Sequence, residues 1–231
     1  NNVAVGAAVT IAGILMGCLW VSGAGNLLAD FVIFLANGKL LVALLLTAVV
    51  ALILGMGLPT PAVYLTVAML IVPALVKMGE PELSSHMFAF YFGILANVTP
   101  PVALAAYAAA SIAGADLNRT GFVALRLAIS GFVIPFIFIY SPGLLLNGSA
   151  LDILQVSLSA LFAIMALAVA AEGWFIRPLG YGTRGTFALI TILFVFPSFY
   201  IQMVGYALFA ATTMIIVFEN KFRQSQHLKG L

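Results

Sequence analysis

A run without charge decides the fold. Residues 40–77 read LLVALLLTAVVALILGMGLPTPAVYLTVAMLIVPALVK, and no charge occurs in the 37 residues from 40 to 76. One continuous helix of this length would measure about 55 Å, whereas the hydrocarbon core of a bilayer is about 30 Å thick. The middle, GMGLPTP at 55–61, holds two glycines and two prolines, which disfavour a helix. Because this tip is uncharged, we expect a re-entrant hairpin over 40–76, with helices at 40–55 and 62–76.

A second apolar run is interrupted in the same way. No charge occurs from 83 to 115, and Asn97-Val98-Thr99-Pro100-Pro101 lies near the middle of this run. Neither proline has an N–H group, and each restricts the residue before it to extended conformations. We therefore expect the helix to stop near Asn97 and to start again after Pro101. Two half-helices over 83–113 would then make one broken transmembrane helix.

The composition places both runs in a membrane. Of 231 residues, 64% are apolar and 7% are charged, whereas an average soluble domain has roughly 25% charged residues. This excludes a soluble globular domain, a disordered chain and a nucleic-acid-binding protein. The single cysteine, Cys18, excludes an internal disulfide and a thiolate metal site. We predict an all-α integral membrane protein.

The rest of the chain supplies further apolar segments. Three of them have the length and apolarity of ordinary transmembrane spans: 3–22, 121–140 and 150–171. Residues 26–36, which include Asp30, are expected to form a short helix along the membrane interface. The run 186–218 contains Pro197 and Gln202 and reads either as a tight helical hairpin or as one long tilted span.

The basic residues favour the hairpin for 186–218. With a hairpin, seven of the nine Lys and Arg residues lie on one side of the membrane, whereas a single span divides them four to five. By the positive-inside rule, the side with seven is cytoplasmic. The hairpin over 40–76 then enters from outside, and residues 219–231 form a basic cytoplasmic tail.

The two interruptions predict a binding site. Lipid tolerates irregular backbone only where protein buries it or where it lines a cavity, and freed carbonyl groups at such breaks coordinate sodium. Glycine and proline are common in membrane helices without any site, but two midpoint breaks with hydroxyl residues beside prolines favour a site. Neither break contains Asp or Glu, which argues against a tight divalent-cation site. The candidate oxygen donors are Gly57, Pro59, Thr60, Asn97, Thr99 and Pro100.

No catalytic pattern accompanies these breaks. The chain has no His-Glu-x-x-His, no Gly-x-Ser-x-Gly and no paired carboxylates inside a span, so we do not expect an enzyme. A channel or a purely structural membrane subunit stays open as the alternative to a carrier. His86 follows two serines at a half-helix start, where a cap or interface residue is more common than a ligand or a proton relay.

Several motifs together carry a family resemblance. They are GMGLPTPA at 55–62, IVPAL at 71–75, His86 and NVTPPVA at 97–103. In order and spacing they resemble the C-terminal half of the large permease (M-type) subunit of TRAP transporters. Residues 113–116 and 126–146 look most like the fused permeases that partner TAXI-type binding proteins. The likeness is good over about 1–146, and 150–231 resembles the extra C-terminal helices of those fused forms.

The resemblance implies a sodium-coupled secondary transporter in a bacterial or archaeal inner membrane. Such a permease imports small organic acids by an elevator motion, and a periplasmic substrate-binding protein, here of the TAXI type, delivers the substrate. Its transport domain contains two hairpins and two broken helices related by an inverted repeat, of which this chain matches the second. We therefore expect the chain to be the C-terminal part of a longer permease. The other expected parts are the first repeat and a small four-helix subunit or fused segment, with Na⁺ as coupling ion and no cofactor.

The resemblance also implies a layout. Residues 1–38 form a scaffold helix and an interfacial arm helix, and residues 39–116 form the transport-domain repeat. Residues 117–147 form the transmembrane helix that closes the repeat. Residues 148–231 form a C-terminal transmembrane extension with the basic tail.

In this family sodium lies between the hairpin tip and the broken helix. The resemblance therefore implies that sodium is bound by Gly57, Pro59, Thr60, Asn97, Thr99 and Pro100. The substrate carboxylate is expected near the half-helix N-termini, where backbone N–H groups face anions. The residues implied there are Ala62, Pro101 and Val102.

Overall fold

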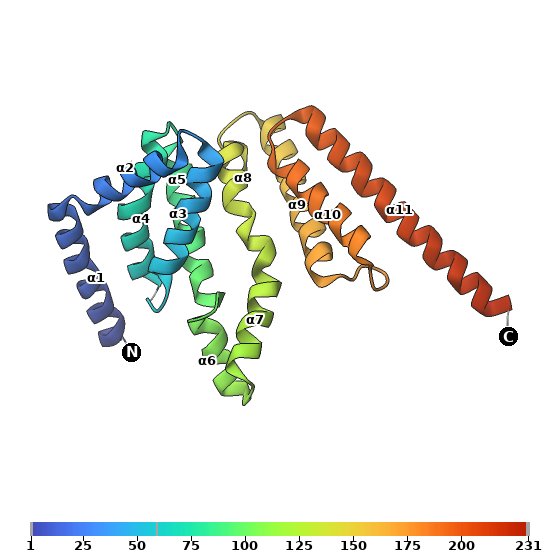
Figure 1. The fold of residues 1–231 in the computed structure, drawn as a ribbon, viewed down its shortest axis with the longest axis horizontal. Coiled ribbons are helices and arrows are strands. Elements are labelled where there is room, and N and C mark those ends of the chain that lie inside the picture. Colours follow the sequence, from blue (N-terminus) through green and yellow to red (C-terminus); the bar gives the residue numbers. More distant parts are fainter. Residues whose placement is uncertain (1, 59, 230–231) are drawn as a thin grey trace. The chain divides into compact units, whose positions relative to one another are not determined.

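The computed structural model describes residues 2–58 and 60–229, and these form two compact units. The first unit covers Asn1–Ile139 and the second Tyr140–Leu231. Within the described residues the regular structure is helical, apart from one isolated bridge between Trp174 and Pro178. Figure 1 shows the helices in chain order.

The first unit contains the helices that the two interruptions predict. They are α1 (Asn2–Ser22), α2 (Ala24–Ala36), α3 (Leu40–Gly55), α4 (Thr60–Lys77), α5 (Glu82–Leu95), the 3-10 turn η1 (Ala96–Val98), α6 (Leu104–Ala113), α7 (Leu117–Ala128), the 3-10 turn η2 (Ile129–Phe132) and α8 (Ile134–Tyr140). The helices α3 and α4 are joined by a short tip and both pack against α5. Their buried faces consist of small and aliphatic side chains, so the backbones lie close together.

The segment predicted to lie along the membrane interface forms α2, which turns away from α1 by 67° at Gly23. Its inner face buries Ala29, Val32 and Ala36, whereas large apolar side chains such as Phe34 stay exposed. Both the buried and the exposed faces of α2 are thus largely apolar, which fits a helix that contacts lipid as well as protein.

A proline and a glycine bring α2 onto α4. Pro73 has no N–H group, so the carbonyl of Met69 lacks its usual helical donor. A Cβ on Gly25 would lie 2.6 Å from that carbonyl oxygen, so only glycine permits this approach. An ion pair between Lys77 and Asp30, at 2.8 Å, joins the same two helices.

The segment expected as a plain span over 121–140 differs from that expectation. It is divided into α7 and α8 by the 3-10 turn η2. Pro135 lies at the start of α8 and cannot donate to Gly131, four residues earlier, which explains why the α-helical bonding changes there. Residues Leu117–Tyr140 together are still long and apolar enough to cross a membrane.

The second unit begins with a 3-10 turn and ends with a long helix. Its elements are η3 (Pro142–Leu145), α9 (Ala150–Glu172), α10 (Tyr181–Val195) and α11 (Phe199–Lys229). Of the two readings of 186–218, the structure has two helices, because α10 ends before Pro197 and α11 begins after it. The helix α10 packs against both α9 and α11. The Gln155 amide donates to Gln202 at 3.0 Å, and Gln202 donates to the Phe196 carbonyl at 3.2 Å.

Four helical segments in the described residues are long and apolar enough to cross a membrane, or five if the bent α1–α2 pair counts as one span. The four are Thr60–Lys77, Leu117–Tyr140, Ala150–Glu172 and Phe199–Asn220. The chain is therefore an all-helical protein with the apolar segments of a multi-pass membrane protein.

Candidate functional site

The hairpin tip is a short irregular segment between two helices. Helix α3 ends at Gly55 and α4 begins at Thr60. Gly57 has a φ of +82°, a left-handed conformation that glycine adopts without steric cost. Pro59, one of the predicted sodium ligands, lies outside the described residues.

The broken helix is interrupted over eight residues. Helix α5 ends at Leu95, the 3-10 turn η1 follows, and Thr99 is extended. Helix α6 begins at Leu104, three residues after Pro101, behind a left-handed Ala103 with a φ of +33°. The first-turn amides of α6 therefore lie slightly beyond Val102, the residue predicted to lie at this N-terminus.

The tip lies against the break. A Cβ added to Gly55 would be 2.6 Å from the Cβ of Ala96 and 3.0 Å from the Gly93 carbonyl oxygen. A Cβ added to Gly57 would be 3.9 Å from a methyl carbon of Val102, which is ordinary van der Waals contact. Two interruptions some 40 residues apart in sequence thus meet in one place, and glycines make the close approach possible.

Two side-chain hydrogen bonds hold the shape of the break. The Thr99 hydroxyl donates to the Leu95 carbonyl at 2.7 Å, and so caps the end of α5. The Tyr107 hydroxyl donates to the Pro101 carbonyl at 2.9 Å. Both bonds use the hydroxyl protons, so the oxygen lone pairs of Thr99 and Tyr107 stay free to accept.

The predicted sodium ligands occupy both sides of this contact. Gly57 and Thr60 are exposed at the tip, whereas Asn97, Thr99 and Pro100 are half-buried at the break. Among the described residues, the side chains of Thr60 and Asn97 make no hydrogen bond, so their oxygens are available to a ligand. Carbonyl, hydroxyl and amide oxygens are hard neutral donors, which suit an alkali cation better than a transition metal.

The predicted substrate residues are placed differently from one another. Val102 is half-buried against Gly57, and Pro101 is exposed with its carbonyl bonded to Tyr107. Ala62 is 4% exposed inside the first turn of α4, so only its backbone could reach a ligand. Thr60 and Ala62 form no hydrogen bond with the break in the described part of the chain.

Residues 2–58 and 60–229 contain no group of three or more His, Cys, Asp or Glu side chains that could hold a metal ion. The site at the tip and the break is therefore built from neutral oxygens in the part of the chain that the structure describes.

Sequence reasoning missed two features of this site. Tyr107 is the one aromatic side chain within LAAYAAASIA of α6, and that isolation was a usable signal. Gly121 was not singled out, yet a Cβ there would lie 2.9 Å from the Tyr107 ring, so α7 approaches α6 closely at this residue. The contact between Gly121 and Tyr107 depends on how α6 and α7 pack against each other, and no local sequence motif specifies that packing.

One of three comparisons with known proteins identifies a family for this chain. The family model of the tripartite ATP-independent periplasmic transporter, DctM component, matches residues 2–153, well over half of the chain. The match covers α1 through α8, including the tip and the break. No curated protein and no solved structure matches the chain. The chain belongs to the DctM family of tripartite ATP-independent periplasmic transporters.

Proposed function

We propose that this chain is part of the permease of a sodium-coupled, binding-protein-dependent transporter that imports small organic acids. Family membership makes it a component of a secondary transporter, which works with a substrate-binding protein and other subunits. The proposal adds the coupling ion, the substrate class and an elevator motion in an inner membrane. It also adds a TAXI-type partner, and the first repeat and a small or fused subunit elsewhere in the complex.

The observation that carries the proposal is the close approach of the tip to the break, with Gly55 against Ala96 and Gly57 facing Val102. Both segments have irregular backbone, which exposes carbonyl oxygens without helical donors. A cation bound between them would be held by oxygens from both segments, as broken helices do in other carriers. Binding would then join the hairpin to α5 and α6.

The substrate's carboxylate would bind to the backbone N–H groups at the same breaks, whereas the cation would bind to the carbonyl oxygens. The first turns of α4 and α6 present backbone N–H groups and the positive ends of helix dipoles. These first turns begin at Thr60 and Leu104. A sodium ion nearby would add positive charge, so ion and anion would favour each other's binding.

The test is uptake of organic acids into proteoliposomes that contain the complete permease and its binding protein. We expect wild-type uptake to require a sodium gradient and to saturate. Thr99→Ala should remove most sodium-dependent uptake because it deletes the hydroxyl that caps α5, and Thr60→Ala should do so by deleting a tip oxygen. Ser111→Ala is the matched control, since that hydroxyl is exposed on α6 and bonds only the Tyr107 carbonyl.

Each alternative gives a different result. Uptake without saturation indicates a channel, and uptake that needs neither sodium nor Thr99 overturns the ion assignment. A purely structural subunit gives complexes that bind the periplasmic protein but transport equally well with every variant.

A further inference from the structure

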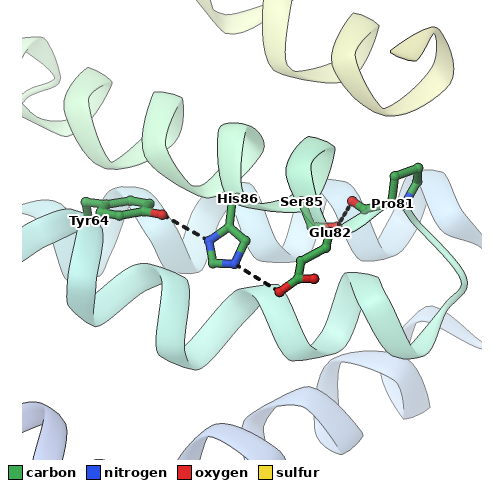
Figure 2. A network of polar contacts seen from close by, with 5 residues as sticks. All are labelled: Tyr64, Pro81, Glu82, Ser85 and His86. Carbon is green, nitrogen blue, oxygen red and sulfur yellow. Dashed lines mark hydrogen bonds and ion pairs between the residues drawn. The ribbon is translucent and has the colours of Figure 1, made fainter. Parts of the chain in front are cut away.

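Outside the tip and the break, a row of three polar side chains joins α4 to α5. The Tyr64 hydroxyl lies 3.1 Å from Nδ1 of His86, and Nε2 of His86 lies 3.9 Å from Oε1 of Glu82. Figure 2 shows the imidazole between the phenol and the carboxylate, with one ring nitrogen toward each. Tyr64 belongs to α4, whereas His86 and Glu82 lie one turn apart on α5.

This arrangement satisfies the ring in both of its protonation states. When the ring is neutral with a proton on Nε2, the Tyr64 hydroxyl donates to Nδ1. When the ring gains a proton, Nδ1 becomes a donor and the hydroxyl rotates to accept. The charged ring then makes a charge-assisted hydrogen bond and faces the Glu82 carboxylate, and such bonds are stronger than neutral ones. Protonation of His86 therefore tightens the link between the two helices.

Few other ionisable groups lie near the ring. The helix α3 and the turns η1 and η2, which also pack against α5, contain no ionisable side chain. On α4 the charged residue is Lys77, whose ammonium group is paired with Asp30. On α5 itself the remaining ionisable side chain is Tyr91, whose ring packs edge-on against Phe138.

The loop between the two helices contributes one more carboxyl, Glu80. The His86 side chain is 35% exposed, while Tyr64 is half-buried with its ring edge-on to Phe90, the two ring centroids lying 5.6 Å apart. The ring of His86 is thus partly exposed and is held by a hydrogen-bond partner from another helix.

This row of side chains is connected to the candidate sodium site through α4. Tyr64 follows Thr60 by four residues, so the two side chains lie on one face of α4 a single turn apart. The neighbouring Val63 lies close to α5, because a Cβ on Gly93 would lie 2.7 Å from a methyl carbon of Val63. A tighter bond between Tyr64 and His86 therefore holds the first turn of α4 against the helix that leads into the break.

We propose that His86 is a proton-binding site shared by α4 and α5, and that its protonation raises the affinity of the tip and the break for sodium. The effect on sodium rests on the proposed function, whereas the proton site itself does not. Histidine is the side chain whose charge ordinarily changes between about pH 5 and 8, so the link would loosen as the pH rises through that range.

The proton site is tested directly by histidine NMR on the complete permease in lipid nanodiscs without sodium. Because His86→Gln removes one ring resonance from the spectrum of the complete permease, it assigns the resonance of His86, and His227→Gln does the same for the other histidine of this chain. We expect the His86 resonance to shift with pH, and Tyr64→Phe to change the midpoint of that shift, because the ring loses the hydroxyl that bonds Nδ1. Tyr91→Phe should leave the midpoint unchanged. A midpoint that does not respond to Tyr64→Phe overturns the proposal.

The link to sodium is tested by the sodium concentration that gives half-maximal uptake, at pH 5.5 and pH 8 without a pH gradient. We expect this concentration to be about fivefold lower at pH 5.5, a coupling at the low end of typical values. His86→Gln should remove the difference and His227→Gln should keep it. Equal pH dependence in wild type and His86→Gln overturns the coupling. Uptake indifferent to sodium at both pH values overturns the sodium assignment instead, and the NMR titration then decides the proton site alone.

Discussion

The Tyr107 hydroxyl donates a hydrogen bond to the Pro101 carbonyl at 2.9 Å, and so fixes the orientation of that carbonyl in the broken helix. Tyr107 also lies against Gly121 of α7. A residue of α6 thus fixes the break, and α7 packs against that residue.

Removal of this hydroxyl should weaken the site without unfolding the protein. Tyr107→Phe loses one hydrogen bond, worth about 1 kcal/mol, and leaves the ring in place. We expect the sodium concentration for half-maximal uptake to rise by up to about fivefold, with the melting temperature nearly unchanged. Gly121→Ala should act in the same direction, because its Cβ would lie 2.9 Å from the Tyr107 ring. An unchanged sodium response in both variants would show that Tyr107 does not position the break.

The helices α4 and α5 should not tolerate a methyl group at Gly93. A Cβ there would lie 2.7 Å from a methyl carbon of Val63, in a buried contact. We expect Gly93→Ala to destabilise the protein by about 1–3 kcal/mol, the usual cost of overpacking a core. Thermal unfolding of the purified permease measures this cost.

A matched control is Gly17→Ala in α1, where no atom lies within 4 Å of an added Cβ. That change should be neutral or stabilise slightly, because alanine is the better helix former. If Gly93→Ala melts at the same temperature as Gly17→Ala, that result contradicts the close packing of α4 against α5 at Gly93.

The loop between α4 and α5 contains a carboxyl whose charge opposes folding. Burial raises the pKa of Glu80 above its ordinary value. The folded state therefore binds more protons than the unfolded state between the ordinary carboxyl pKa of about 4.3 and the raised one, and stability falls as the pH rises through that window. We expect Glu80→Gln to raise the melting temperature at pH 7, and the gain to disappear below about pH 4. A gain that persists at low pH would point to a cause other than charge.

In the second unit, Arg184 caps the end of α9. Its Nε donates to the Ala170 carbonyl at 2.8 Å and its Nη2 to the Ala171 carbonyl at 3.1 Å. A lysine cannot span two carbonyls with a planar fork, so Arg184→Lys should cost about 1 kcal/mol. Arg119→Lys, at an exposed residue near the start of α7, should cost nothing measurable. Thermal unfolding of the two variants compares them.

The sequence could predict the local interruptions because proline and glycine act locally. The helix expected over 40–55 is α3, and the helix expected from 62 to 76 lies within α4. The break after Asn97 was predicted from two prolines for the same reason. Of the two readings of 186–218, the break at Pro197 corresponds to the hairpin.

Features that depend on the packing of separate helices were not predictable. The pairing of Tyr64 with His86 depends on the rotation of α4 against α5, and no spacing within either helix specifies that rotation. The left-handed Ala103 is unusual for a residue with a Cβ, so the late start of α6 at Leu104 was not expected. The turn at η2 was missed although Pro135 signalled it, because overall apolarity alone suggested one plain span.

The contact between the tip and the break has a consequence for gating. It is formed by glycines against small side chains, Gly55 on Ala96 and Gly57 on Val102. If the tip moved away, the side chains of Ala96 and Val102 would lose these neighbours, and burial of one methyl or methylene group contributes about 0.8 kcal/mol. The two segments therefore fit closely, yet little free energy is needed to separate them. An ion bound between them could then decide whether the gate stays closed.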